Sequence, residues 1–439
     1  MEIAVIGGGF TGLTTSLRLQ KKGYNVSLFE KESILGGLAS GFKLNNWEWS
    51  LEKHYHHIFT SDKAVSSLME EIGIKDDLFF KRPKTGTYFN NSKLKFISQN
   101  CKNIYPLDSA IDLLKLPYLS FFEKIRAGVI ILFLKITPFW KQLETITAYN
   151  WLNKYMGEKA FKILFEPLFV GKFGDYAKEI NMSWFWARIK KRSPTLGYIK
   201  GGIQKFIDCL KSEIEKNKGK IFLNSEILEI VKEGEKFCLT VKNNGKFQKK
   251  TFDKVIVTLP TKKFLKITPT LPNSYKDPLL GINHLDSLNL ILILKKPFLK
   301  NIYWLNINDK SFPFLALVDH NNFIESKNYG ENHILYIGNY LPFDHDYFKK
   351  SPKELLDIFD PFLKQISQDY KENIIDYKMF HGYEGQTIVT TNYSKIKPSI
   401  LTPWKNLYLA NLDMVYPWDR GVNYAIELGE AVKKIISNS

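Results

Sequence analysis

The amino-acid sequence predicts an α/β protein in which a Rossmann-like nucleotide-binding domain carries an inserted α+β domain. Three observations predict it: a short apolar strand leads into a glycine-rich turn and a helix, a second strand ends in an acid, and apolar strands recur much later in the chain. The chain has 439 residues, of which 44% are hydrophobic. At roughly 150 residues a domain, two or three folding units are expected, and the composition excludes disorder, collagen and coiled coil.

The first element is a strand that is buried on both faces. Ile3–Ile6 is a continuous apolar run, which is typical of a parallel sheet covered on both sides. In the turn that follows, Gly7 permits a tight bend, Gly9 lets backbone N–H groups approach a pyrophosphate, and Gly12 allows the next helix to pack close to the strand. Thr11 lies in the first turn of that helix and is assigned to the cofactor with the three glycines.

A helix and a second strand complete the motif. The helix is expected from about Thr11 to Lys22, with Gly23 as its stop. A strand at Val26–Phe29 then delivers Glu30, roughly 20 residues beyond the glycine-rich turn. An acid at this spacing accepts hydrogen bonds from an adenosine ribose and disfavours a 2′-phosphate. The motif therefore predicts a bound dinucleotide.

A second glycine pair, Gly36-Gly37, follows the acid within Ile34–Phe42. On this pair and the motif before it, the sequence resembles the superfamily of FAD-dependent amine oxidases, protoporphyrinogen oxidases and phytoene desaturases. The resemblance implies FAD as the cofactor, a glutathione-reductase-like cofactor domain of the GR2 type, and contacts from Gly36 and Gly37 to the FAD phosphates and ribityl chain. Leu38 stands where many members carry a basic residue.

Two later regions carry the same resemblance. Gly197–Ile203 precedes a helical segment, and Glu226–Val231 resembles the segment whose backbone meets the adenine, so that Ile227 is assigned to the cofactor. Val255–Pro260 resembles the buried strand that follows. Taken alone, these segments would be ordinary core strands.

The resemblance is also carried by the C-terminal segment Asn411–Gly421, which lies between an apolar strand and a final helical pattern. In the superfamily this segment meets the isoalloxazine and ribityl chain, and the helix after it points its N-terminus at the flavin. Free N–H groups there would stabilise an anionic reduced flavin. The resemblance implies cofactor contacts from Asp413, Gly421 and Val422, although Asn411 stands in place of the usual glycine. No cysteine lies near this segment in the sequence, so FAD is expected to be bound non-covalently.

Histidine is concentrated in Trp47–Phe59, where three of the chain's eight histidines fall within four positions. On a strand, His54 and His56 would share one face and His57 would lie on the other. A histidine titrates near neutral pH and could take a substrate proton as a hydride leaves for flavin N5. One of the three is therefore the candidate catalytic residue, and ordinary surface or core histidines are the alternative. A metal site is not expected, because the sequence supplies no further ligands at suitable spacing.

The segment Asn411–Gly421 is called the flavin-facing segment after this resemblance. Two aromatic residues within it, Trp418 and Tyr416, are assigned to the wall of the substrate cavity. Simple packing is the alternative. The cofactor domain must be assembled from three stretches, residues 1–74, 195–281 and 397–439. Residues 75–194, expected to be mainly helical, and residues 282–396, expected to be mixed, form the substrate domain.

The formal net charge is +17, but the lysines are scattered singly or in pairs, which indicates a solvated surface rather than a nucleic-acid interface. The three cysteines, Cys101, Cys209 and Cys238, are far apart and indicate a reducing compartment. The chain begins with a strand and without a basic leader, so a cytoplasmic location is expected. Ala127–Leu134 is too short to span a membrane and is interpreted as a buried helix, with peripheral contact to a membrane surface as the alternative.

The main functional hypothesis is an FAD-dependent oxidoreductase that moves a hydride from a C–N or C–C unit of a mid-sized, partly apolar substrate to flavin N5. The sequence has no second dinucleotide motif, so electrons are expected to leave to oxygen, a quinone or another acceptor. One alternative is redox-neutral, because His57–Lys63 distantly resembles a run of UDP-galactopyranose mutases, which act on a nucleotide sugar. Another is a basic, non-enzymatic flavoprotein that binds nucleic acid or membrane.

Overall fold

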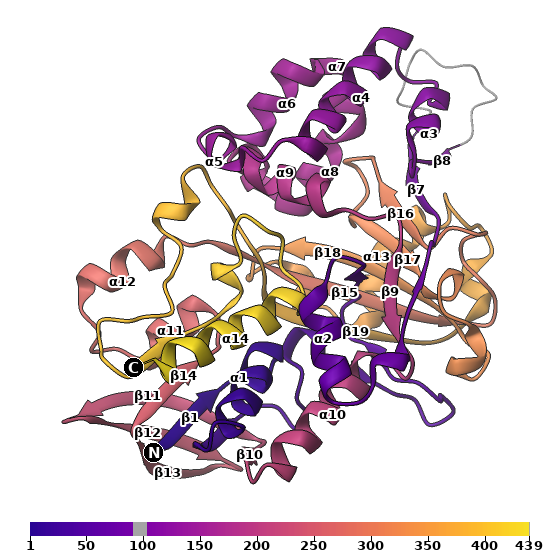
Figure 1. The fold of residues 1–439 in the computed structure, drawn as a ribbon. Helices are drawn as coiled ribbons and strands as arrows, with labels where there is room; N and C mark the ends of the chain where they lie inside the picture. The colour runs from indigo at the N-terminus through magenta and orange to yellow at the C-terminus, as the bar shows by residue number, and fades with distance from the viewer. Residues whose placement is uncertain (91–102, 439) are drawn as a thin grey trace.

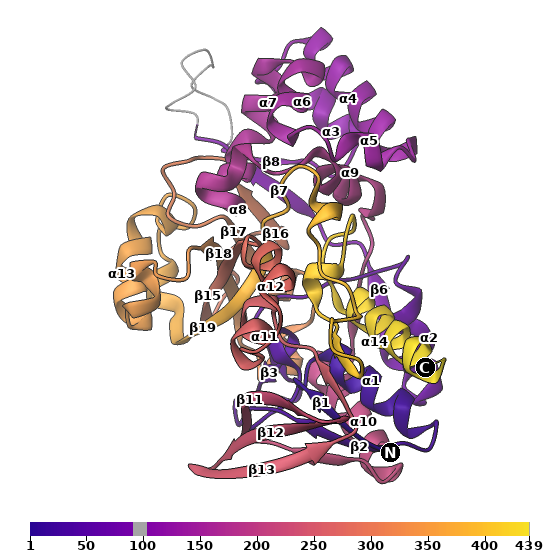
Figure 2. The same ribbon diagram turned by 90° about the vertical axis from the view of Figure 1, so that its left-hand side faces the viewer.

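The computed structural model describes residues 1–90 and 103–438. Figures 1 and 2 show three layers of structure stacked along the molecule: a parallel sheet with its helices at the base, a mixed sheet in the middle and a group of helices at the far end. Both termini lie in the base. Cys101 lies outside the described residues, whereas Cys209 and Cys238 are free thiols.

The base is built on a five-stranded parallel sheet in the order β10-β2-β1-β14-β20. The strands are β1 (Glu2–Ile6), β2 (Asn25–Phe29), β10 (Lys220–Phe222), β14 (Lys254–Val257) and β20 (Leu407–Leu409). The central strand β1 is almost entirely buried because both faces of the sheet are covered. Strands from the beginning, middle and end of the chain thus meet in one sheet.

Helices cover one face of this sheet and a small antiparallel sheet covers the other. Ile3 and Val5 of β1 belong to an apolar cluster with the three helices, α1 (Phe10–Gln20), α10 (Ile203–Lys216) and α14 (Val422–Ser437). Ala4 and Ile6 point the opposite way, toward a meander of three strands, β11 (Ser225–Glu233), β12 (Lys236–Asn243) and β13 (Lys246–Phe252). The alternation along β1 therefore divides the core into two layers.

The middle of the molecule is a seven-stranded mixed sheet in the order β19-β15-β18-β17-β16-β7-β8. Its strands are β7 (Thr85–Tyr88), β8 (Ile104–Pro106), β15 (His284–Leu294), β16 (Trp304–Ile307), β17 (Ala316–Asp319), β18 (His333–Leu341) and β19 (Ile374–Thr387). Helix α13 (Pro352–Leu363) packs against β15 and β19. The region expected to be mainly helical, residues 75–194, thus contributes two strands, β7 and β8, to this sheet.

The helical group follows β8. It comprises α3 (Ala110–Lys115), α4 (Phe121–Ile136), α5 (Trp140–Leu143), α6 (Ala148–Met156), α7 (Glu158–Leu164), α8 (Glu166–Phe173) and α9 (Met182–Lys191). The segment interpreted as a buried helix lies in α4, where only Ala127 and Leu134 are buried. That interpretation is wrong, because the other apolar side chains of α4 remain partly or largely exposed.

Short elements connect the layers. They are β3 (Gly41–Phe42), β4 (Leu51–Glu52), β5 (Ile58–Phe59), α2 (Lys63–Glu71), β6 (Leu78–Lys81), β9 (Leu196–Ile199), α11 (Thr261–Ile267) and α12 (Asn273–Leu280). β3 pairs with β4, and β9 pairs with both β5 and β6. In the part of the chain that the structure describes, no helix has both the length and the apolar character needed to cross a bilayer.

Candidate active site

The turn between β1 and α1 leaves room for a phosphate group. Gly7 has a φ of +107° and donates its N–H to Phe29 O at 2.8 Å. A Cβ at Gly12 would lie 1.9 Å from Gly7 O, so only glycine lets the helix begin so close to the strand. A Cβ at Gly9 would meet no described atom within 4 Å. The first turn of α1 has neither a side-chain cap nor an acid, and its N–H groups can serve an anionic ligand.

Glu30 is held at the edge of this turn. Its side chain is buried, with one carboxylate oxygen accepting from Gly8 N at 2.7 Å and the other from Glu32 N at 2.9 Å. An ionised carboxylate has further lone pairs, so both oxygens can still accept a hydroxyl donor. The arrangement fits the ribose of a dinucleotide whose phosphates lie over the glycine turn.

The second glycine pair lies against the first glycine turn. Gly36 and Gly37 have φ values of +122° and +55°, and Gly36 N donates to Gly8 O at 2.9 Å. A Cβ at Gly36 would lie 2.7 Å from a methyl group of Ile207, and a Cβ at Gly37 would lie 3.6 Å from Gly9 Cα. Two glycine segments that are separate in sequence therefore form one backbone surface that excludes side chains.

The end of the flavin-facing segment is the N-terminus of α14. Gly421 is the N-cap and Val422 is buried; the first turn has no side-chain cap and no acid. A Cβ at Gly421 would meet no described atom within 4 Å, so the backbone is not crowded at this point, and an uncapped helix N-terminus can serve an anionic ligand. Ile227, assigned to the adenine, is buried at a register shift in β11.

Asp413 is surrounded by protein donors. One carboxylate oxygen accepts from Thr261 Oγ1 at 2.5 Å, and the other accepts from Thr387 Oγ1 and from the ring of His284, both at 2.7 Å. Burial acts to raise the pKa of Asp413, but His284 and the two hydroxyls lower it to about 2. Burial likewise opposes the rise in the pKa of His284, which Asp413 brings about. The pair fixes the flavin-facing segment to α11, β15 and β19.

The three candidate histidines lie in an irregular segment after β4. The alternation expected for a strand does not hold, because the chain turns and His56 Nδ1 lies 2.6 Å from His54 O. His54 Nδ1 accepts from the amide of Asn289 at 2.9 Å, and His57 Nε2 lies 2.8 Å from Tyr303 Oη. The described hydrogen bonds thus engage Nδ1 of His54 and of His56 but Nε2 of His57.

All three histidines are neutral at physiological pH. Each ring is only partly accessible to solvent, and burial lowers the pKa of His54 and His57 to about 3 and that of His56 to about 4. The charge of Arg420 contributes to the lowered values of His54 and His56, which places both rings within electrostatic reach of the flavin-facing segment.

The two aromatic residues assigned to the substrate cavity have different environments. Tyr416 is buried; its hydroxyl donates to Glu144 at 2.9 Å and accepts from the amide of Asn181 at the same distance. Trp418 is half-buried and stacks on Trp186 with ring centroids 5.4 Å apart. Trp418 thus lies at the junction with the helical group, whereas Tyr416 ties the segment to that group.

The basic residues around the flavin-facing segment could not be identified from the sequence. Arg420 donates to Gln386 and, at 2.5 Å, to Tyr340 Oη, while Lys172 Nζ lies 4.3 Å from the Tyr340 ring centroid. Arg188 pairs with the carboxylate beside Arg420. No local motif distinguishes these residues from the many other basic side chains, and only the fold brings them together.

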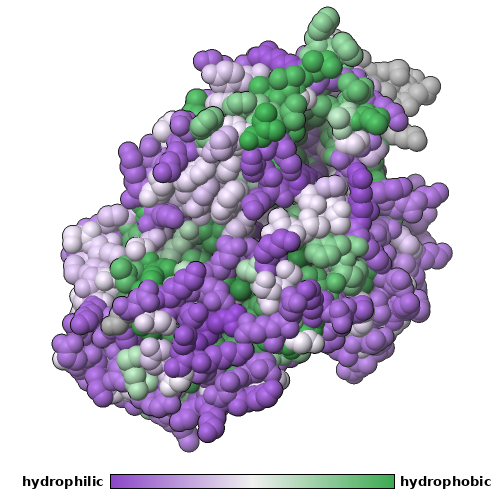
Figure 3. All heavy atoms as spheres, viewed as in Figure 1, coloured by the Kyte–Doolittle hydropathy of each residue, from purple (hydrophilic) through white to green (hydrophobic). Residues whose placement is uncertain are grey.

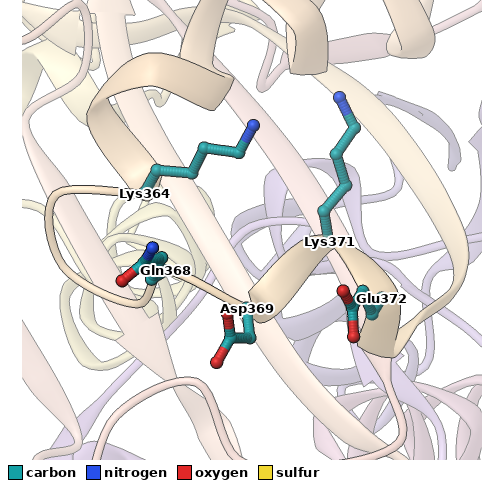
Figure 4. Close-up of a pocket in the computed structure, with 5 residues that line it drawn as sticks. All are labelled: Lys364, Gln368, Asp369, Lys371 and Glu372. Atoms are coloured by element: carbon teal, nitrogen blue, oxygen red, sulfur yellow. The ribbon is translucent and has the colours of Figure 1, made fainter.

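A surface hollow lies elsewhere, at the C-terminal end of α13. Figure 4 shows the five side chains around it, which are Lys364, Gln368, Asp369, Lys371 and Glu372. They are polar and none belongs to the arrangement described above. Among the described residues, no group of three or more His, Cys, Asp or Glu side chains is placed to hold a metal ion.

Comparison with known proteins extends these observations over the whole chain. A family model described as flavin containing amine oxidoreductase matches residues 10–431. A 4,4'-diapolycopen-4-al dehydrogenase from Metabacillus indicus is 24% identical over 296 residues, which make up 57% of this chain and 55% of that protein. The alignment thus spans about half the length of this curated relative.

Solved structures are similar over the full chain. Cyclohexylamine oxidase from Brevibacterium oxydans IH-35A superimposes with a TM-score of 0.75 at 12% identity, covering 100% of this chain and 98% of that one. Reduced UDP-galactopyranose mutase superimposes with a TM-score of 0.76 at 13% identity, covering 100% and 94%. At these identities the likeness establishes a shared mixed α/β fold.

Proposed function

The chain belongs to the flavin containing amine oxidoreductase family, and we propose that it is an FAD-dependent oxidoreductase that takes a hydride from a C–N or C–C unit of a mid-sized, partly apolar substrate. When bound, FAD supplies the hydride acceptor at N5. The chain's own residues bind and orient the reactants and move the proton. Oxygen or a quinone is the proposed electron acceptor.

The observation that carries the proposal is the continuous backbone surface formed by the glycine turn, the second glycine pair and Glu30. Its open position at Gly9 and the uncapped N-termini of α1 and α14 fit a long anionic cofactor. We assign FAD contacts to Gly7, Gly9, Thr11, Gly12, Glu30, Gly36, Gly37, Ile227, Asp413, Gly421 and Val422. At Asp413 the N–H donates to Asn411 and the carbonyl accepts from Tyr393, so the contact would use the second lone pair of the carbonyl. The helix-covered sheet with its antiparallel meander supports a GR2-type cofactor domain made of residues 1–74, 195–281 and 397–439.

Among the three histidines, we assign proton acceptance to His56. A ring nitrogen that lies 2.6 Å from a carbonyl oxygen must carry the hydrogen, so Nδ1 donates to His54 O and Nε2 keeps its lone pair. His54 is in the opposite state, because Nδ1 accepts from Asn289 and the hydrogen is on Nε2. The lowered pKa keeps His56 unprotonated at neutral pH, so its Nε2 lone pair is not already occupied by a proton.

The test begins with an absorbance scan of the purified protein. A flavin spectrum, retained or restored by added FAD, is expected, and a colourless protein that does not bind FAD would end the proposal. The protein is then mixed anaerobically with pools of amines, porphyrinogens, polyenes and nucleotide sugars. Bleaching of the flavin identifies the substrate class, and admitting oxygen or a quinone identifies the acceptor. Turnover of a nucleotide sugar by pre-reduced protein only, without bleaching, would establish the redox-neutral reaction instead.

We also propose that the exposed face of α4 contacts a membrane surface that carries anionic lipid. Large apolar side chains on and just after α4 are between 43% and 82% exposed: Phe121, Phe122, Ile125, Val129, Leu132, Phe133, Ile136 and Phe139. Figure 3 shows hydrophobic residues gathered over the helical group, where Figure 1 places α4. A contiguous apolar surface of this kind is typical of an interaction site.

Charge on α4 supports a lipid partner of negative charge. The helix carries three basic residues, Lys124, Arg126 and Lys135, and one acid, Glu123. The three cations donate to backbone carbonyls rather than to carboxylates, so their charge remains uncompensated. Basic residues that flank an apolar face attract an anionic leaflet.

Co-sedimentation with vesicles tests this contact. Wild-type protein is expected to pellet with vesicles of phosphatidylcholine and phosphatidylglycerol, and the substitution Phe122→Ser, at the most exposed apolar position of α4, is expected to weaken binding. Phe247→Ser, at an exposed position on β13, is the matched control and should leave binding unchanged. Wild-type protein that stays in the supernatant, or equal loss in both variants, would contradict the proposal.

A further inference from the structure

Three basic side chains from separate parts of the fold lie over two aromatic rings, with Lys172 contacting both. Lys172 is in α8, Arg188 is in α9, and Arg420 directly precedes α14. Lys172 Nζ and the guanidinium carbon of Arg420 lie 4.3 and 5.0 Å from the ring centroid of Tyr340 on β18. Lys172 and Arg188 also share the ring of Trp184, at 5.8 and 5.0 Å. We call Lys172, Arg188 and Arg420 the cation cluster.

The cation cluster has more positive charge than its surroundings neutralise. Arg188 pairs with Asp419, the residue before Arg420, and the charges of Lys172 and Arg420 also act on this carboxylate. Burial acts to raise the pKa of Asp419, but the three cations outweigh it and hold the pKa below its usual range. Uncompensated like charges that are partly removed from water are costly, and an added anion would relieve that cost.

Lys172 experiences this cost most directly. Burial lowers the pKa of Lys172 well below its usual range, and Arg188 and Arg420 lower it further, while Asp419 acts in the opposite direction. The side chains that face it are aromatic or cationic apart from this carboxylate: Phe173, Trp184, Tyr340, Arg188 and Arg420. An anion beside Lys172 would therefore restore its proton as well as pair with it.

The cation cluster is accessible to a ligand and lies within electrostatic reach of the proposed proton acceptor. The side chains of Arg188 and Asp419 are 41% and 30% exposed, so solvent reaches the cluster. Arg420 lowers the pKa of His56, which places the two side chains within electrostatic reach of each other. Guanidinium groups bind carboxylate and phosphate oxygens in a bidentate manner, which makes arginine well suited to hold such a group.

We infer that the cation cluster binds an anionic group, a carboxylate or a phosphate, on the substrate whose C–N or C–C unit is oxidised. The inference rests on the proposed function for the identity of the ligand as substrate. It makes the substrate a molecule with an apolar body and an anionic end. The anion would pair with Lys172, Arg188 and Arg420 and thereby orient the reacting carbon with respect to His56.

Calorimetric titration of the FAD-loaded protein tests the inference with three probes: phenylbutyrate, phenyl phosphate and phenylbutylamine. Phenylbutyrate, phenyl phosphate or both are expected to bind, the tighter one identifies the anionic group, and phenylbutylamine is expected not to bind. Lys172→Gln should weaken binding of the anion about tenfold or more, as loss of a charged hydrogen bond does. Lys178→Gln, at an exposed lysine just after α8, is the matched control and should leave the affinity unchanged.

A second substitution should change the affinity for the anion in the opposite direction. Asp419→Asn removes the negative charge that acts on all three cations, so it should tighten anion binding several-fold, which a merely damaged fold would not do. Failure of both anions to bind, or unchanged affinity in both Lys172→Gln and Asp419→Asn, would overturn the inference. This test can fail independently of the proposed function. If amines bleach the flavin but neither anion binds, the protein is still an oxidoreductase and only the inference of an anionic substrate is wrong.

Discussion

Replacing Asp413 by asparagine is the most direct test of how the flavin-facing segment is held. The side chains of Asp413 and His284 are each only 4% exposed, and two threonine hydroxyls complete the carboxylate's partners. Asparagine has the same shape but turns one acceptor oxygen into a donor and leaves His284 without its counter-charge. Removing one partner of a buried pair costs about 3 to 5 kcal/mol. We expect the Asp413→Asn variant to lose that amount in the free energy of unfolding.

The pH dependence of this loss follows from the two pKa shifts. The pKa of Asp413 is lowered in the folded state, so this carboxylate stabilises the fold above its unfolded pKa, about 3.9. That stabilisation is lost as pH falls through the folded pKa, about 2. The pKa of His284 is raised in the folded state, so its positive charge stabilises the fold below its unfolded pKa, about 6.5. That stabilisation is lost as pH rises through the folded pKa. The difference in the free energy of unfolding between wild type and the Asp413→Asn variant should therefore be largest between about pH 4 and 6.5.

Urea unfolding followed by tryptophan fluorescence measures both effects at a series of pH values. Asp346→Asn is the control, because Asp346 forms a surface pair with Lys349 and its removal should change stability little. An Asp413→Asn variant as stable as wild type at about pH 5.5, or one whose deficit does not shrink on either side of that range, would refute the reasoning. The m-value should stay constant if the fold is retained.

Three further outcomes are expected. Gly12→Ala should abolish FAD absorbance in the purified protein, because its Cβ would lie 1.9 Å from Gly7 O; a variant that keeps wild-type FAD affinity would contradict this. His56→Gln should slow substrate-dependent flavin bleaching about 100-fold or more, whereas His54→Gln should retain most of the rate, and equal loss in both would remove the assignment. The bleaching rate should show no histidine titration between about pH 6 and 8, since burial lowers the pKa of His56 to about 4 and that of His57 to about 3.

The elements that the sequence predicted well are those whose signals are local. The first strand, the glycine turn, the first helix and Glu30 follow one another within about 30 residues, and each position is dictated by backbone geometry. The helical segment expected after Gly197–Ile203 is α10, and the apolar strand expected at Val255–Pro260 is β14. Apolar periodicity and glycine placement suffice for such elements because no distant partner decides them.

The features that the sequence did not reveal depend on distant partners. β7 joins the middle sheet through parallel pairing with β16, about 200 residues later, and nothing near Thr85–Tyr88 indicates it. The alternation that a strand would give the three histidines is not found, and the segment instead contacts Asn289 of β15 and Tyr303 just before β16. Apolar residues in α4 indicated burial, but hydropathy alone does not separate a core helix from one with an unpartnered face.

The flavin-facing segment links the two binding functions that we propose. Its beginning is fixed by Asp413 to α11, β15 and β19, and its end carries Asp419 and Arg420 into the cation cluster just before the N-terminus of α14. A shift at Asp413 would therefore displace both the helix N-terminus and the cation cluster. It follows that Asp413→Asn should weaken FAD and phenylbutyrate together, whereas Lys172→Gln should weaken only phenylbutyrate. If the two substitutions changed FAD affinity equally, the position of Asp413 would not control the position of the N-terminus of α14.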